Sequence, residues 1–317
     1  PEASAVSLHS QHSQQCAKTK IFIKIIFNLL NIKKIYFKVA FIGKKRRILK
    51  NIFIDSYIEK YIQGYMMRFD DLDKRLRQYE TAYDFCVPQE NFIVVRLDGR
   101  GFTRLTKEIW QFEAPFDIRF RDLMAHTVRH LMQCGFNVAY GYSESDEISL
   151  LLRRDDDTFK RKTRKIISVL AGEASAAFSV AHGQTAAFDA RVCVLPNEKL
   201  VVDYFRWRHE DSYRNALNAH CYWMLRKKGE SVSRATDTVS GLTRAQKHDL
   251  LFENSINFNE LPAWQKRGFG VYFQTALKEG FNPKTDEIVQ VKRQILHTDF
   301  ELPLGDDYGA FVLEKII

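Results

Sequence analysis

The sequence lacks the cysteine pattern that stabilises small secreted proteins and the long apolar runs that anchor membrane proteins. Its five cysteines are an odd number without a C-x-x-C spacing, so they indicate neither a disulfide framework nor a zinc site, and a reducing compartment is the simpler expectation. A run of about 18 apolar residues is also lacking. Lysines interrupt the most apolar stretch, residues 21–54, every few positions, so we expect no membrane anchor.

Acidic residues are scarce in one part of the chain. Residues 1–65 hold 12 Lys and Arg against three Asp and Glu, whereas the remaining 252 residues hold 36 of each sign. The net charge of +9 therefore belongs to this leader, and any basic RNA-binding surface must be a local patch in a balanced domain. The leader is either a transit segment or translated upstream sequence before a start at Met66 or Met67. We expect a cytoplasmic protein, or a mitochondrial one if the leader is a genuine transit segment.

Residues 66–317 read as one globular domain, without an internal repeat or a low-complexity linker. The apolar, β-branched runs 92–97 and 148–152 predict buried strands, and the stretch 117–134 between them has apolar positions at helical spacing. The order is thus strand, helix, hairpin. We expect the second and third strands to flank the first, which brings Asp98 and Asp146 close together at one sheet edge.

These two aspartates are the candidate catalytic residues. Two carboxylates held that close repel each other unless a divalent cation lies between them, and Mg²⁺ is the natural candidate. Asp98-Gly99 alone is a common turn, but together with Ser145-Asp146-Glu147 it favours a metal site. Because adjacent strand residues face opposite sides, Glu147 is expected to make a structural contact instead.

A basic cluster, residues 160–165, opens a long helix predicted from Thr158 onward. Cations are misplaced at a helix N-terminus, which attracts phosphate, so Lys162 and Lys165 are candidates to grip a triphosphate together. The alternative is a solvated charged face. His126 and His130 have i, i+4 spacing but no glutamate partner between them, so they read as ordinary helix residues rather than metal ligands.

Several ordered motifs carry a resemblance. The sequences RLDGRGF at 96–102, SDE at 145–147, FKRK at 159–162, FDAR at 188–191 and NFNELP at 257–262 resemble the tRNA(His) guanylyltransferase-like family of 3′-to-5′ polymerases. The resemblance implies an α+β fold, with a palm-like (ferredoxin-like) antiparallel sheet packed with helices. It places the palm core at about 90–205 of a single catalytic domain, 66–317, whose C-terminal part mixes helices and strands.

The resemblance also implies a chemistry. Asp98, the backbone carbonyl of Gly99 and Asp146 would hold two Mg²⁺ ions, and the nucleotide would lie against Arg100, Gly101, Phe102 and Ser145. ATP would activate a tRNA 5′-monophosphate, which the 3′-hydroxyl of GTP or another incoming nucleoside triphosphate then attacks. The expected partners are tRNA and nucleoside triphosphates, and the expected assembly is a homotetramer.

One departure from the family pattern bears on substrate choice. After Trp207-Arg-His-Glu-Asp211 the chain has Tyr213 where the eukaryotic guanylyltransferases have histidine. This resembles the bacterial and archaeal-type branch, which prefers template-dependent repair of 5′-truncated tRNA. Arg208, Tyr213 and Asn215 are candidate tRNA contacts, and Trp207 is another, although a helix tryptophan is usually a core residue.

Two other functions compete. A nucleotidyl cyclase also uses a palm-like sheet with paired aspartates, but the motifs at 188–191 and 259–262 argue against it. A catalytically silent RNA-binding protein is the non-enzymatic alternative, and the retention of Asp98, Gly99 and Asp146 argues against that.

Overall fold

The computed structural model describes residues 69–282 and 286–316, and the chain divides into two units, residues 1–82 and 83–317. In the first unit the described part is helix α3 (Phe69–Glu80), with Asp70 and Asp71 in its first turn and Arg77 in its last, as the helix dipole favours. The predicted leader, residues 1–65, lies outside the described residues. Among the described helices, none combines the length and apolar character needed to cross a bilayer.

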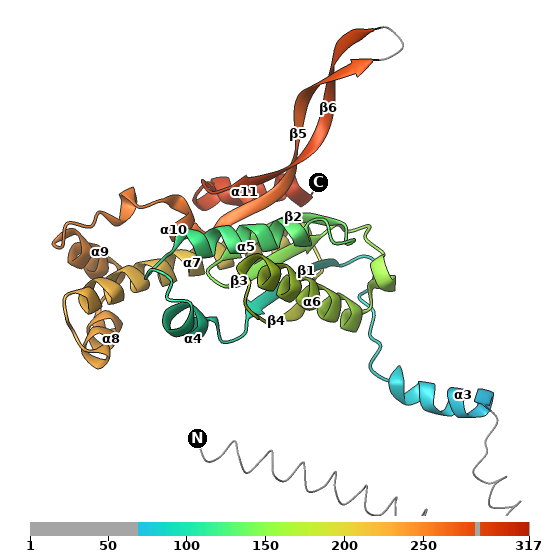
Figure 1. Ribbon diagram of the computed structural model, residues 1–317, viewed down its shortest axis with the longest axis horizontal. Helices are drawn as coiled ribbons and strands as arrows, with labels where there is room; N and C mark the ends of the chain where they lie inside the picture. The colour runs from blue at the N-terminus through green and yellow to red at the C-terminus, as the bar shows by residue number, and fades with distance from the viewer. Residues whose placement is uncertain (1–68, 283–285, 317) are drawn as a thin grey trace, which may run out of the picture. The chain divides into compact units, whose positions relative to one another are not determined.

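The second unit is built on a six-stranded antiparallel sheet in the order β4-β1-β3-β2-β5-β6 (Figure 1). Its strands are β1 (Phe92–Gly99), β2 (Val138–Glu144), β3 (Glu147–Leu152), β4 (Phe188–Leu195), β5 (Phe269–Asn282) and β6 (Glu287–Asp299). This confirms the predicted α+β class. The expected flanking of β1 by both hairpin strands is wrong, because only β3 lies beside β1, β2 lies beyond β3, and β4 takes the other side of β1.

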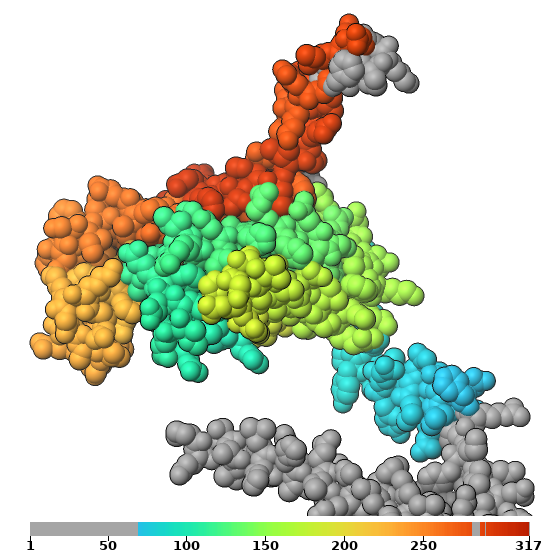
Figure 2. All heavy atoms as spheres, viewed as in Figure 1, coloured from blue at the N-terminus to red at the C-terminus, as the bar shows by residue number. Residues whose placement is uncertain are grey.

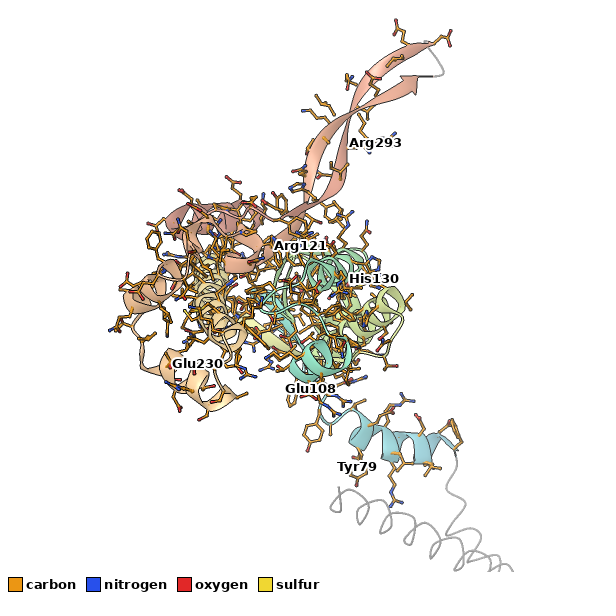
Figure 3. All side chains as sticks on the ribbon, turned by 60° about the vertical axis from the view of Figure 1, so that its left-hand side comes forward. Tyr79, Glu108, Arg121, His130, Glu230 and Arg293 are labelled. Atoms are coloured by element: carbon orange, nitrogen blue, oxygen red, sulfur yellow. The ribbon has the colours of Figure 1, made fainter. Side chains whose placement is uncertain are left out.

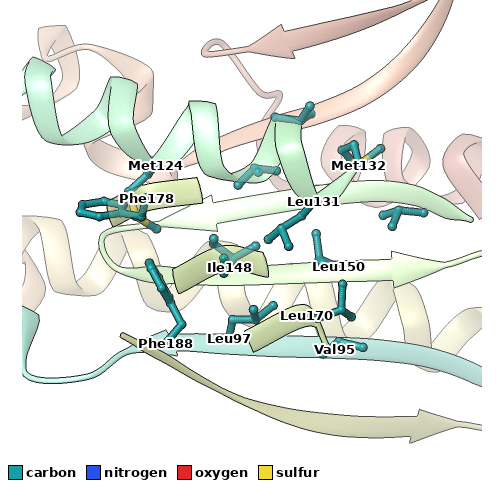
Figure 4. Packing of buried hydrophobic residues seen from close by; sticks show 14 of the residues in the cluster. Val95, Leu97, Met124, Leu131, Met132, Ile148, Leu150, Leu170, Phe178 and Phe188 are labelled. Atoms are coloured by element: carbon teal, nitrogen blue, oxygen red, sulfur yellow. The ribbon is translucent and has the colours of Figure 1, made fainter. Parts of the chain in front are cut away.

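Helices cover both faces of the sheet. Helices α5 (Ile118–Leu131) and α6 (Thr163–His182) pack on one face, where Val95, Leu97 and Ile148 meet Leu131 and Phe178 (Figure 4). Helices α7 (Glu198–Lys227) and α11 (Gly305–Ile316) pack on the other, against Phe92, Val94 and Tyr140. Strands buried on both faces need apolar residues at every position, which explains the continuous runs in the sequence.

The predicted long helix from Thr158 is interrupted at its start. Residues Thr158–Arg161 form a 3₁₀ turn in which Phe159, Lys160 and Arg161 have φ of 53°, 54° and 54°, and α6 begins only at Thr163. The Arg161 side chain is buried, and its guanidinium donates hydrogen bonds to backbone carbonyls of Val87, Pro88, Asn91, Arg154 and Asp156. These hydrogen bonds stabilise the turn despite its positive φ angles. The regular helix therefore begins only at Thr163.

The C-terminal part adds a small helical subcore and a long hairpin. Helices α8 (Val232–Gly241), α9 (Arg244–Phe252) and α10 (Ala263–Arg267) pack on the second half of α7. In β5, residues Phe269–Tyr272 pair with β2, whereas the rest pairs with β6 alone. The hairpin therefore extends beyond the sheet, as Figures 2 and 3 show, with Arg293 on its outer part.

Candidate active site

The two candidate aspartates come together because β1 and β3 end side by side. Asp98 lies opposite Glu147 in the strand register, and the Gly99 amide donates to the Asp146 carbonyl at 3.0 Å. The turn between β2 and β3 is tight, with Ser145 at φ 48°, and the Ser145 hydroxyl donates to the Asp146 carboxylate at 3.1 Å. The predicted proximity of Asp98 and Asp146 is confirmed by this register.

Two arginines neutralise the Asp98 carboxylate. Arg96 shares its face of β1, because strand residues two apart point the same way, and donates to Asp98 at 3.1 Å. Arg191, opposite Arg96 on β4, also forms an ion pair with Asp98. This face of β1 is turned toward α7.

Arg208 of α7 contacts the residues on both sides of the β2–β3 turn. Its side chain is 4% exposed, and Nη2 lies 2.5 Å from carboxylate oxygens of both Glu144 and Glu147, while Nη1 lies 3.2 Å from Asp211. Burial raises the pKa of Glu144 to about 8, and the Arg208 charge acts in the opposite direction. The structural contact predicted for Glu147 is confirmed.

Burial also raises the pKa of the Asp146 carboxyl, and the negative charge of Asp98 adds to this shift. A positive charge placed between Asp98 and Asp146 would act against both effects. The site is thus electrostatically suited to a cation.

A cavity of about 330 Å³ opens beside the β2–β3 turn. Asp146, Glu147 and Ser145 form its acidic end, and aromatic side chains form part of the remaining wall beside polar, charged and small residues. Its lining comes from the segment after β1, the loop 112–117, α5, the second half of α7 and α10, and includes Phe102, Lys107, Phe112, Asp117, Arg121, Ser212, Asn215, Trp223 and Trp264. Its acidic end can hold a cation, and its aromatic wall can hold a flat ring.

The other residues predicted beside Asp98 have distinct surroundings. Gly101 adopts φ 71° and begins the short helix α4 (Phe102–Arg104), Phe102 is a core residue whose ring also faces the cavity, and Arg100 is exposed. The Phe102 ring packs 5.0 Å from Phe188 and 5.2 Å from Phe178. Phe102 therefore shapes the cavity wall through the core.

The structure does not bring Lys162 and Lys165 to the aspartates. Phe178, near the C-terminal end of α6, is the part of this helix that packs beside Phe102, and 20 helical residues span about 30 Å. At the other end Lys162 forms an ion pair with Asp84 at 2.6 Å, and the Lys165 ammonium lies 5.7 Å from the centre of the Phe159 ring. The spacing argument was local and could not reveal which end of the helix faces the site.

The three residues predicted to contact tRNA also lie in different surroundings. Arg208, predicted to contact tRNA, is instead buried among carboxylates. Asn215 lines the cavity. The Tyr213 hydroxyl lies 3.3 Å from His248 Nε2 and its ring packs on Phe258, in the helical subcore.

His130, which is labelled in Figure 3, lies on α5, and its Nε2 is 2.6 Å from a carboxylate oxygen of Glu173.

Sequence reasoning missed several participants. The roles of Arg191 and Glu144 depend on strand register, and the walls formed by Trp223 and Trp264 depend on helix packing. A usable signal existed for Arg208: Val201, Phe205, Arg208 and Ser212 recur at helical spacing, which places the arginine on the buried face of α7.

The donor set fits magnesium in type. Two carboxylates and the Gly99 carbonyl are hard oxygen ligands. The guanidinium groups of Arg96 and Arg191 are paired with the Asp98 carboxylate, so an ion that binds Asp98 must compete with them. Within residues 69–282 and 286–316 no group of three or more His, Cys, Asp or Glu side chains is placed to hold an ion, so an ion here would rely on Asp98, Asp146, the carbonyl, and its own water or phosphate ligands.

The fold and the site define a palm-like α+β protein with paired carboxylates beside a ligand-sized cavity. A family model described as tRNAHis guanylyltransferase matches residues 73–196, and one described as the Thg1 C terminal domain matches residues 199–301. The chain therefore belongs to the tRNA(His) guanylyltransferase family, a family of nucleotidyltransferases. The resemblance seen in the sequence motifs is confirmed.

Two similar proteins each cover more than half of this chain. The tRNA(His) guanylyltransferase of Schizosaccharomyces pombe is 29% identical over 243 residues, covering 73% of this chain and 92% of that protein. The Debaryomyces hansenii tRNA(His) guanylyltransferase is 32% identical over 206 residues, covering 61% and 77%.

Among solved structures, a bacterial tRNA(His) guanylyltransferase (Thg1)-like protein in complex with ATP is 26% identical, with a TM-score of 0.61 over 77% of this chain and 99% of that one. A structure described in the same words, in complex with GTP, is 29% identical, with a TM-score of 0.59 over 77% and 98%.

Proposed function

We propose that this chain adds nucleotides in the 3′-to-5′ direction to the 5′ end of tRNA, directed by the opposing strand, with Asp98, the Gly99 carbonyl and Asp146 as ligands of two Mg²⁺ ions. The observation that carries the proposal is the meeting of Asp98 and Asp146 at adjoining strand ends beside a cavity. Membership of the guanylyltransferase family supports this function over the nucleotidyl cyclase and the silent RNA-binding protein.

The cavity is the proposed site of a nucleoside triphosphate. Its volume of about 330 Å³ lies in the range of small-molecule pockets, and its wall offers Phe112, Trp223 and Trp264 to a base. The acidic end with Ser145 and Asp146 would then face the phosphates, where a cation is needed. The neighbours solved with ATP and with GTP support this assignment.

Mg²⁺ would stabilise the attacking and leaving oxygens of an in-line phosphoryl displacement. The protein's own residues prepare the ligands. Arg96 and Arg191 orient the Asp98 carboxylate, and Arg208, by bonding Glu144 and Glu147, fixes the turn that carries Asp146. Arg191 is 58% exposed, so it can turn toward solvent when an ion takes its place at Asp98.

Tyr213 supports the template-dependent version of the reaction. Its ring packs on Phe258 and its hydroxyl lies beside His248, so it does not line the cavity where a base would bind. If base pairing selects the incoming nucleotide, no guanosine-specific side chain is needed.

The test uses tRNA lacking its first nucleotide, ATP, Mg²⁺ and labelled nucleoside triphosphates, with the opposing base changed through all four identities. We expect the Watson–Crick complement to be added in each case. Addition of guanosine opposite adenosine as fast as opposite cytidine would show a protein-encoded preference and replace repair by non-templated guanylylation.

Assembly and location remain proposals drawn from the resemblance and the leader. We infer a homotetramer, which light scattering coupled to size-exclusion chromatography would test, and a cytoplasmic or leader-directed mitochondrial location. A protein that begins at Met67 should retain nucleotide addition. If it folds but loses activity, the leader supplies RNA contacts.

A further inference from the structure

Trp207 is an exposed tryptophan on the helix that covers the active-site face of the sheet. Its exposed fraction is 56%, whereas Tyr204 and Phe205 on the same helix are buried. An exposed aromatic ring beside a catalytic centre is a candidate ligand contact when its neighbours fix its orientation, because stacking of a base needs an accessible ring held in place.

The direction of Trp207 follows from its neighbours on α7. Tyr204 and Arg208 point into the sheet, where the Tyr204 hydroxyl lies 3.1 Å from Ser149 and Arg208 bonds Glu147. Arg206 points to the α11 side, where it pairs with Asp306 at 3.2 Å. One residue further along, a helix turns by about 100°, which directs Trp207 away from α11 and toward the β1–β4 side.

Two side chains of α7, Arg208 and Tyr204, pack against the Trp207 indole. The Arg208 guanidinium lies 4.8 Å from the centre of the Trp207 ring, and the Tyr204 ring meets it edge-on at 5.9 Å and 82°. Arg208 is itself held by Glu144 and Glu147. One face of the indole therefore lies against a buried cation that holds its orientation, and with 56% of the residue exposed the ring is pre-oriented for stacking.

A series of side-chain contacts leads from Trp207 to Asp98. Beyond Arg208, Glu147 lies 3.4 Å from Arg96, and Arg96 lies 3.1 Å from Asp98. Trp207 does not line the cavity proposed for the nucleoside triphosphate. It is therefore placed for the other reactant, the RNA end that must reach the same carboxylates.

We propose that Trp207 is a stacking platform for the terminal base at the 5′ end of the RNA substrate, holding that nucleotide beside Asp98. The inference rests on the proposed function. An RNA base fits better than a protein surface, because the side chains one and two turns further along the same side of α7, Asp211 and Arg214, are charged rather than apolar. Stacking on one aromatic ring with a cation nearby is how proteins hold unpaired bases.

The test compares Trp207→Leu and Trp207→Phe, with Phe252→Leu as a control at an exposed aromatic residue of α9. The probe is tRNA with 2-aminopurine as its 5′ nucleotide, whose fluorescence falls when the base stacks. We expect quenching with the wild-type protein, Trp207→Phe and Phe252→Leu but not with Trp207→Leu. The KM for tRNA should rise about 5- to 100-fold in Trp207→Leu and far less in Trp207→Phe.

Three results would overturn the platform: equal quenching and KM in Trp207→Leu and wild type, a raised KM for the nucleoside triphosphate instead of tRNA, or a changed oligomeric state, which would make Trp207 an interface between copies. The quenching assay needs binding only. If the wild type binds and quenches the probe but adds no nucleotide, the proposed function fails while the platform stands.

Discussion

Replacing Arg208 by methionine should destabilise the second unit severely, although Arg208 is neither a core hydrophobe nor a proposed metal ligand. The side chain is 4% exposed and reaches Glu144 and Glu147 at 2.5 Å and Asp211 at 3.2 Å. Methionine keeps much of the volume but leaves these carboxylates without their shared cation. Breaking a buried ion pair by removing one partner costs about 3–5 kcal/mol.

Urea unfolding followed by circular dichroism measures this cost. With a denaturant slope of about 2.5 kcal/mol per molar urea for a unit of this size, the midpoint should fall by about 1–2 M. The double variant with Glu144→Gln should recover part of the loss, because it also removes a carboxyl group that is left buried without its cation, and the coupling should be about 1 kcal/mol or more.

Arg206→Met is the matched control on the same helix. Arg206 also forms an ion pair, but its partner Asp306 is 96% exposed, so the change should cost less than about 1 kcal/mol. The reasoning is refuted if Arg208→Met unfolds within about 0.5 M urea of the wild type, or if Arg206→Met costs as much as Arg208→Met.

Three further predictions address the site, pH and backbone. Asp98→Ala and Asp146→Ala should each lower nucleotide addition far more than tenfold with an unchanged circular dichroism spectrum; activity within tenfold, about 1.4 kcal/mol of barrier, would remove either residue from the site. Burial lowers the pKa of His209 to about 4, below its ordinary value of 6.5, so the unfolded chain binds the extra proton and wild-type stability falls as pH drops from 6.5 to 4. His209→Phe should flatten the pH dependence of the urea midpoint over that window, and parallel curves would contradict this. Gly268→Ala should destabilise by about 2–3 kcal/mol, because φ is +71° and the new Cβ would lie 2.2 Å from a backbone carbonyl oxygen of β2, whereas Gly172→Ala, with open space around it, should be neutral or stabilising in equilibrium unfolding.

The sequence by itself determined individual strands and helices whose formation depends on the pattern of neighbouring residues. The runs 92–97 and 148–152 predicted β1 and β3 because strands covered on both faces are apolar throughout. The first run ends at Asp98, and the second begins just after Asp146 and Glu147. The motifs around Asp98 and Asp146 indicated the family, which the family models confirm. Hydrophobic spacing also predicted the helix between these strands, which is α5.

Tertiary structure decided which distant residues meet. The same spacing rules placed Lys162 and Lys165 on one helix face, but the packing of α6 puts that end about 20–24 Å along the helix from Phe178, which packs beside Phe102. Arg208 and Trp207 are neighbours in sequence with opposite environments, one buried among carboxylates and one exposed. Their roles depend on how α7 is rotated against the sheet, and that rotation is set by side-chain packing between segments far apart in the chain, which no local pattern encodes.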